Sequence, residues 1–151
     1  MQLDFAIIAD GATQRPDGKT DIFGGGFDTL WAPSVPAIHP QLALVIRLLS
    51  DPLEASEPHS LRIVLRSPEG DEIANAEGTI EPAPAELTSA EESGRISSTL
   101  ALTFQNLTFE VWGPYEFAIL VDDRPLREPL ELQLRQAPTE EAGFPPGQDP
   151  Q

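Results

Sequence analysis

The chain has 151 residues, no cysteine, and a formal charge of −16 from 25 acidic and nine basic residues. This length suits one ordinary domain with its own core, and the lack of cysteine excludes disulfides, thiolate zinc sites and a cysteine nucleophile. The negative charge disfavours binding to nucleic acid or to anionic membranes. Because the acidic residues are scattered over many segments, we expect the charge to serve solubility; the alternative is attraction to a basic partner.

The predicted elements are short strands, because 16 prolines leave few windows long enough for a helix. Most of the chain between the prolines alternates with the period of two that is typical of a half-buried strand. In chain order the positions on the predicted inner faces are Leu3, Phe5 and Ile7; Leu42, Leu44, Ile46 and Leu48; Leu61, Ile63 and Leu65; Ile96, Ser98, Leu100, Leu102 and Phe104; Tyr115, Phe117, Ile119 and Val121; and Leu130, Leu132 and Leu134. Two weaker strands are predicted over 22–31 and over 73–80, and the small residues of the second suit a sheet edge.

These eight segments predict an all-β fold, a two-sheet antiparallel sandwich. No helix is available for a parallel crossover, so we expect hairpin-like connections and a core made of the two inner faces. We predict a single domain over residues 1–136. Residues 81–94 form a long acidic connection with room for one helical turn, and residues 137–151 are predicted to be a disordered, acidic and proline-rich tail.

The stretch WGPYEFAILVDD, residues 112–123, is similar to the corner where immunoglobulin-type domains enter their penultimate strand. In those domains a tyrosine near the start of the strand hydrogen-bonds to upstream backbone, two residues before a core cysteine. Tyr115 takes the place of the tyrosine and Phe117 that of the cysteine. The similarity implies an immunoglobulin-like sandwich in which Tyr115 ties the corner and Phe117 lies in the core.

A longer pattern of motifs runs across residues 3–135. It joins an opening strand, a D-G-K turn, G-G-G, a W-A-P break, H-x-L-x-I-x-L, G-x-Y-x-F-x-I-x-V-D and a closing P-L-x-L. The residues that carry it are Asp17, Gly18, Lys19, Gly24, Gly25, Gly26, Trp31, His59, Leu61, Ile63, Leu65, Gly113, Tyr115, Phe117, Asp122, Pro129 and Leu130. This pattern resembles that of a bacterial family of small proteins of unknown function. The resemblance implies the sandwich fold and assigns no catalytic or ligand-binding residue.

Asp122 and Asp123 follow the predicted strand over 115–121 and precede Pro125, which places them in a hairpin turn. The alternative is a weak calcium site that pools them with the acidic residues near 51–57 or 69–72. Calcium takes about six to eight oxygen ligands, and no loop has the D-x-[DN]-x-[DN]-G spacing that gathers them locally. We therefore predict a turn without a metal.

The two histidines, His39 and His59, stand beside prolines in chain connections and lack the spacing of zinc ligands. His59 and Ser60 are neighbours on a strand and so point to opposite faces, which prevents them from acting as base and nucleophile. Both histidines are expected at the surface without supporting contacts. The sequence therefore predicts a protein that is not an enzyme and that holds no metal or cofactor.

The glycines at 24–26 lack both the spacing and the following helix of a phosphate-binding loop, so they predict a bulged or kinked strand. Such an edge is weakly protected by side chains and is open to strand addition by a second copy or another protein. The candidate partner contacts are Gly24, Gly25, Gly26, Phe27 and Trp31, with both aromatics expected to be mainly buried. The predicted function is a non-catalytic protein-interaction or assembly module; the alternative is a small-molecule or carbohydrate-binding sandwich.

The stretch MQLDFAIIADGATQ contains no basic residue and only a short apolar run before Asp10. A secretion signal has a basic beginning and a longer apolar run, and a membrane-spanning helix is longer still. Together with the lack of cysteine, this predicts a cytoplasmic protein that does not bind membranes.

Overall fold

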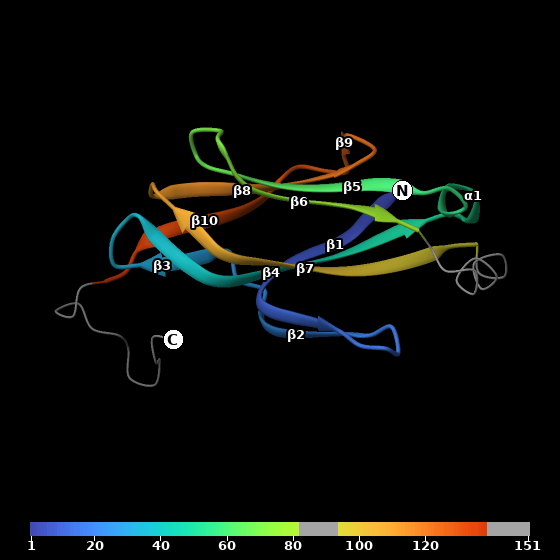
Figure 1. Cartoon of the computed structure of the whole chain (residues 1–151), viewed down its shortest axis with the longest axis horizontal. Coiled ribbons are helices and arrows are strands. Elements are labelled where there is room, and N and C mark those ends of the chain that lie inside the picture. The colour runs from blue at the N-terminus through green and yellow to red at the C-terminus, as the bar shows by residue number, and fades with distance from the viewer. Residues whose placement is uncertain (82–93, 139–151) are drawn as a thin grey trace.

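The computed structural model describes residues 1–81 and 94–138, which form a sandwich of two β-sheets (Figure 1). The described elements are β1 (Gln2–Gln14), β2 (Thr20–Gly25), β3 (Thr29–Ala32), β4 (Ala37–Ser50), α1 (Pro52–Ala55), β5 (His59–Arg66), β6 (Glu72–Ile80), β7 (Ile96–Phe109), β8 (Gly113–Val121), β9 (Arg124–Pro125) and β10 (Leu130–Gln136). The helical turn predicted near 81–94 and the tail predicted from residue 137 fall almost entirely outside the described residues.

The strands form two sheets, which confirms the predicted two-sheet sandwich. Sheet A has the order β2-β1-β4-β7, and sheet B has the order β3-β10-β8-β5-β6 with β9 paired to β8. The small-residue strand β6 lies at an edge, as predicted. The expectation of purely antiparallel pairing is wrong at one place, because β3 runs parallel to β10.

The predicted single strand over 22–31 is also wrong, since these residues form β2 and β3 in different sheets. Gly24 has a φ of 59° and Gly26 a φ of 88°, a backbone region that side chains with a Cβ rarely adopt. A Cβ at Gly24 would also collide with the Asp10 carboxylate. The glycines therefore end β2 and let the chain cross from sheet A to sheet B.

Helix α1 is a single turn of four residues, which agrees with the expectation that the prolines leave little room for helices. Asp51 caps it: its carboxylate accepts a hydrogen bond from the Glu54 amide at 2.8 Å, and the Glu54 carboxylate accepts one from the Asp51 amide at 3.3 Å. Pro52 stands in the first turn, where its missing N–H costs nothing. The D-P-x-E pattern is a capping box that the sequence alone could have revealed.

The core lies between the two sheets and is built from their inner faces, as predicted. The predicted inner face of β1 is wrong after Leu3, because a register shift between Leu3 and Phe5 turns Ala6 and Ile8, instead of Phe5 and Ile7, toward the core. Leu44 and Ile46 of β4 are fully buried against Ile63 of β5 and Phe117 of β8 within one hydrophobic cluster. The Phe117 ring lies 5.7 Å from the Phe104 ring, centroid to centroid. Burial of these alternating side chains is the main source of stability, because each removes apolar surface from water.

Tyr115 forms the predicted corner. Its hydroxyl donates a hydrogen bond to the Val111 carbonyl oxygen at 2.8 Å and accepts one from the Val111 amide at 3.3 Å. Its ring meets the Phe109 ring edge-on, with centroids 4.8 Å apart. The corner therefore joins the end of β7 to the beginning of β8 by polar and aromatic contacts.

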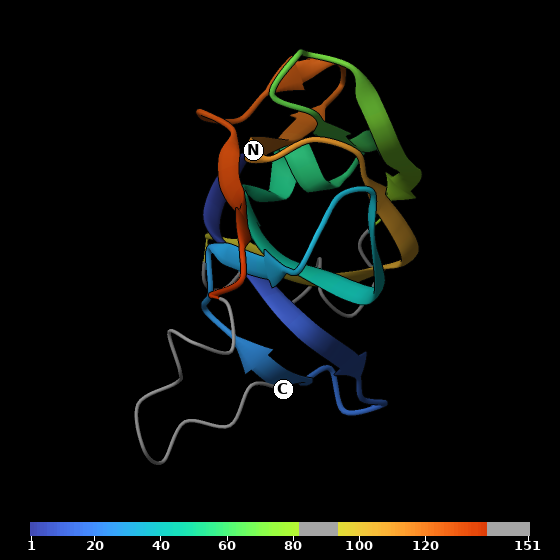
Figure 2. The ribbon, with the colours of Figure 1, turned by 90° about the vertical axis from the view of Figure 1, so that its left-hand side faces the viewer.

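The β1–β2 hairpin, residues 9–25, forms an additional layer on the side of sheet A that faces away from sheet B (Figures 1 and 2). Strand β1 pairs with β4 only as far as Ala9, and its remaining residues pair with β2. The Gln14 side-chain amide donates to the Thr99 carbonyl oxygen of β7 at 2.8 Å, and the Gln41 side-chain amide of β4 donates to the Asp10 carbonyl oxygen at 3.2 Å. These contacts hold the hairpin against sheet A.

Candidate functional site

The exposed large hydrophobic side chains are concentrated in one part of the sequence. Among the described residues they are Ile22, Phe23, Trp31, Ile38 and Leu53, and four of these five lie within residues 22–38. We call Ile22, Phe23, Trp31 and Ile38 the apolar edge surface. Its members come from β2, β3 and the beginning of β4. Apolar side chains that remain in water are candidate contact sites for another protein where they lie together; these four share one segment of the sequence, whereas Ile22 and Phe23, as neighbours on a strand, point to opposite faces.

Two of these strands are open sheet edges. In the described part of the chain, β2 pairs only with β1, and β3 pairs only with β10. An edge strand presents unpaired N–H and C=O groups that can accept a further strand. The predicted segment therefore supplies two open edges, one in each sheet, rather than one.

The predicted contact residues have different positions in the structure. Gly24, Gly25 and Gly26 are exposed and form the exit from β2, while Phe27 is half-buried against the core. Trp31 was expected to be mainly buried, but 59% of it is exposed. The reason is its register: Trp31 pairs with the exposed Arg135, whereas its neighbour Leu30 pairs with Leu134 and packs against the core.

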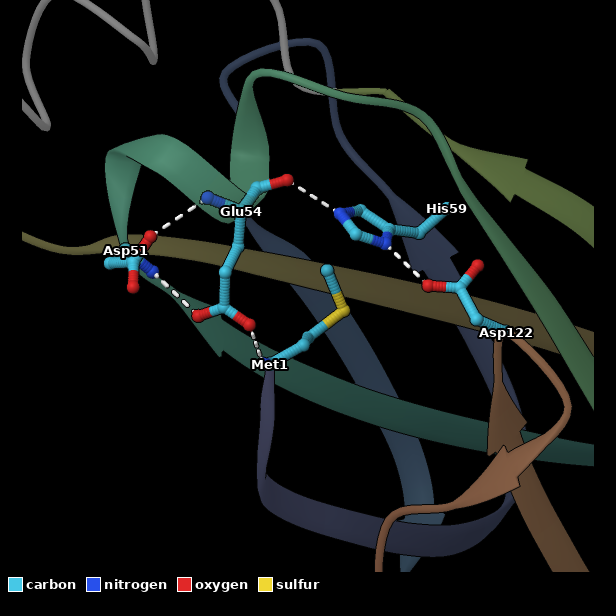
Figure 3. A network of polar contacts seen from close by, with 5 residues as sticks. All are labelled: Met1, Asp51, Glu54, His59 and Asp122. Carbon is cyan, nitrogen blue, oxygen red and sulfur yellow. Dashed lines mark hydrogen bonds and ion pairs between the residues drawn. The ribbon is translucent and has the colours of Figure 1, made fainter.

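A polar cluster at one end of the sandwich was not foreseen (Figure 3). The Nδ1 atom of His59 lies 2.6 Å from a carboxylate oxygen of Asp122, and its Nε2 atom is hydrogen-bonded to the carbonyl oxygen of Glu54. The Asp122 carboxylate also accepts a hydrogen bond from the Ser60 amide at 3.0 Å. Glu54 in turn pairs with the amino group of Met1. The cluster links the α1 region to β5 and to the β8–β9 turn.

His59 is therefore not the unsupported surface histidine that was expected, and only 16% of its side chain is exposed. Both ring nitrogens face oxygen acceptors, so both must carry hydrogen for the two bonds to form together. The hydrogen bond to Asp122, followed by that to Glu54, raises the pKa of His59 above its ordinary value. The same contact with His59, with help from the Ser60 amide, lowers the pKa of Asp122.

Asp122 and Asp123 occupy the predicted hairpin turn. Val121 pairs with Arg124, so the two aspartates form the connection, with φ values of 51° and 62°. These left-handed conformations are typical of the two-residue turns that join hairpin strands, and aspartate tolerates them. The turn also lines a cleft of about 440 Å³, together with His59, Arg124 and Leu126.

The cluster does not have the geometry of a nucleophile and base. The Ser60 hydroxyl lies 3.5 Å from Asp122, whereas both nitrogens of His59 are already bonded to Asp122 and Glu54. No nitrogen remains to accept a proton from a hydroxyl group. His39, the other histidine, is half-buried in β4, and its Nε2 atom has no hydrogen-bond partner in the described structure. Across residues 1–81 and 94–138 no three His, Cys, Asp or Glu side chains gather to hold a metal ion.

The sequence carries no local signal for the His59–Asp122 contact, because 63 positions separate the two residues. Ile22 and Phe23 belong to the predicted strand over 22–31, but the contacts predicted there were the glycines, Phe27 and Trp31. Ile38 lies at the beginning of β4, and only its exposure in the structure shows that its side chain points away from the core.

The fold and the exposed edges define a two-sheet β-sandwich protein with open strands on both sheets. No helix in the described segments is long and apolar enough to cross a membrane. The chain belongs to a family of unknown function, DUF6941, whose family model matches residues 4–135. No curated protein and no solved structure matches the chain.

Proposed function

We propose that this protein is a non-catalytic interaction or assembly module that binds another protein chain through the apolar edge surface. The observation that carries the proposal is the grouping of four of the five exposed large hydrophobic residues of the described structure within residues 22–38. A further support is that β2 and β3 are edge strands, where backbone groups are available for strand addition.

Trp31 is the residue expected to contribute most to binding. Tryptophan is enriched among the residues that dominate protein interfaces, because it buries a large rigid surface at a small cost in conformational entropy. It lies on the outer side of sheet B, where its partner in the register is Arg135. A partner strand added beside β3 would cover the indole ring and would pair with the backbone of Thr29 and Trp31.

The proposal is tested by capture of partners from native cell extract, followed by mass spectrometry. Wild-type protein is compared with Trp31→Ser and Phe23→Ser. Leu53→Ser is the matched control, because Leu53 is the one large exposed hydrophobic of the described residues outside the surface and is 82% exposed. The proposal expects a stoichiometric protein that is lost with the first two variants and kept with the control. Equal recovery with all four proteins would contradict it.

The alternative function, binding of a small molecule or carbohydrate, is supported by the cleft beside the His59 cluster. It combines the charged Asp122 and Arg124 with the apolar Leu126, as ligand sites often do. A metabolite retained in native mass spectra and lost with Arg124→Ala would favour this function.

The lack of cysteine supports a cytoplasmic location, and the family resemblance of the pattern across residues 3–135 supports a bacterial origin.

A further inference from the structure

His59 connects two segments that are far apart in the sequence (Figure 3). Its Nδ1 atom faces a carboxylate oxygen of Asp122 in the β8–β9 turn, and its Nε2 atom faces the carbonyl oxygen of Glu54 in α1. A carbonyl oxygen has no hydrogen to donate, and neither has an ionised carboxylate. Both bonds therefore exist together only while both ring nitrogens carry hydrogen, that is, while His59 is an imidazolium cation.

The charged groups around His59 favour this cation. Those that face it line one cleft and come from three segments, with Met1 before β1, Glu54 of α1, and Asp122 and Arg124 of the β8–β9 turn. On β6, the neighbouring strand, the residue opposite His59 is the uncharged Ile80. The hydrogen bonds to Asp122 and to the Glu54 carbonyl oxygen raise the pKa of His59 above its ordinary value of 6.5, so we expect the proton to leave above pH 6.5.

The proton that leaves is the one on Nε2. The neutral ring keeps a single hydrogen, and a carboxylate accepts a stronger hydrogen bond than a carbonyl group does, so the hydrogen stays on Nδ1 beside Asp122. The turn is also held to β5 without the imidazole, because the Asp122 amide donates to the Ser60 carbonyl oxygen at 3.0 Å and the Ser60 amide donates to the Asp122 carboxylate at 3.0 Å. On the other side, the Nε2 lone pair then faces the lone pairs of the Glu54 carbonyl oxygen, and the two acceptors repel each other.

Helix α1 has few other contacts that hold it in place. It is four residues long, and its only buried residue, Ala55, packs with Ile96 in a small cluster apart from the main core. Leu53 is 82% exposed. The Glu54 carboxylate pairs with the amino group of Met1. Loss of the bond to His59 therefore removes a large part of the contacts that hold α1 in the described structure.

We propose that His59 is a pH-sensitive switch, which joins α1 to the β8–β9 turn while both of its ring nitrogens carry hydrogen and releases α1 when Nε2 loses its hydrogen. Glu54 lines the cleft of about 440 Å³ beside His59 and a second cleft of about 370 Å³ beside Gly94, so movement of α1 changes the shape of both. The switch is independent of the proposed interaction, because none of its residues belongs to the apolar edge surface.

The first experiment follows the imidazole nitrogens by heteronuclear NMR during a pH titration of the full chain. The chain has two histidines, so the signals of His59 are identified by their loss in His59→Gln. We expect Nε2 to lose its hydrogen above pH 6.5 while Nδ1 keeps its own. Asp122→Asn should move this transition to lower pH, because asparagine tolerates the left-handed conformation of the turn but carries no charge.

The second experiment measures the motion of α1. Because the chain has no cysteine, Leu53→Cys provides a single attachment site for a spin label at a highly exposed position. We expect the label to be more mobile above the His59 transition than below it, and we expect His59→Gln to abolish this change. His39→Gln is the matched control, because His39 is the other histidine and lies in β4, and it should leave the change intact.

Glu54→Gln separates the switch from the ion pair with Met1. Glutamine at this position still completes the capping box with Asp51 and leaves the backbone carbonyl group in place, but it removes the negative charge that pairs with the amino group. We expect the change in label mobility to persist in this variant. Loss of the change would assign the motion to the Met1 pair and would overturn the inference.

The inference is also overturned if Nδ1 loses its hydrogen in place of Nε2, or if the label is equally mobile on both sides of the His59 transition. Circular dichroism of each variant shows whether the fold is retained. If the labelled variant does not fold, hydrogen exchange in the unlabelled chain gives the same information. The Ala55 amide donates to the Asp51 carbonyl oxygen at 3.0 Å, and its exchange, corrected for the intrinsic effect of pH, should become faster above the transition. Unchanged protection of this amide would contradict the release of α1.

Discussion

Replacement of Tyr115 by phenylalanine tests the corner that connects β7 to β8. Tyr115→Phe removes one oxygen atom and with it the two hydrogen bonds to the backbone of Val111, at 2.8 and 3.3 Å. The edge-on contact with Phe109 is kept, because the ring itself does not change. The substitution therefore isolates the polar contribution of the corner from its packing.

The expected cost follows from these two bonds. Each contributes about 0.5 to 1.5 kcal/mol of net stability in a protein, and Val111 is half-buried, so water replaces part of the loss. We expect the free energy of unfolding to fall by about 1 to 2 kcal/mol. For a domain of this size that corresponds to a decrease in Tm of roughly 3 to 10 °C.

Urea denaturation measures the loss of stability, provided that the m value of the variant equals that of the wild type.

Tyr115 is also the only tyrosine in the chain, so its ultraviolet titration can be followed directly. Burial raises the pKa of its phenol above the ordinary value. Because the raised pKa belongs to the folded state, its stabilising contribution is present below the unfolded pKa of about 10 and is lost as the pH rises through the folded pKa. Unchanged stability together with an ordinary phenol pKa would refute the corner.

Three further predictions concern the core, the polar cluster and metals. Phe117→Ala leaves a cavity beside Phe104 and should cost about 3 to 5 kcal/mol in urea denaturation, whereas the exposed Trp31→Ala should change stability by less than about 0.5 kcal/mol. The pKa of His59 is raised in the folded state, so its stabilising contribution is complete below about pH 6.5 and is lost as the pH rises through the folded pKa. His59→Gln should remove this part of the pH dependence of stability. A stability profile of the variant that runs parallel to that of the wild type would contradict the prediction. Calcium, zinc and chelator should leave the Tm unchanged at constant ionic strength, and a saturable increase abolished by Asp122→Ala would reverse that expectation.

The sequence alone determined the elements whose signal is local. Strict alternation in segments such as 42–48, 61–65 and 115–121 identified strands and their inner faces, because the period of two is a property of the extended backbone itself. The corner at Tyr115 and the turn at Asp122 were recognisable for the same reason. Their partners lie a few residues away or follow from backbone preferences that each residue carries with it. The cap of α1 is equally local, and the D-P-x-E pattern at residues 51–54 would have identified it.

Only the tertiary structure decided that the glycine segment supplies two edge strands in different sheets, and the candidate surface depends on that. The order of strands in a sheet is set by contacts between segments far apart in the chain, as in the pairing of β3 with β10. That pairing turned Trp31 to solvent, and the crossing after Gly26 placed β2 and β3 in different sheets. The contact of His59 with Asp122 has the same origin, because the two residues meet only when β5 pairs with β8, with Leu61 opposite Val121.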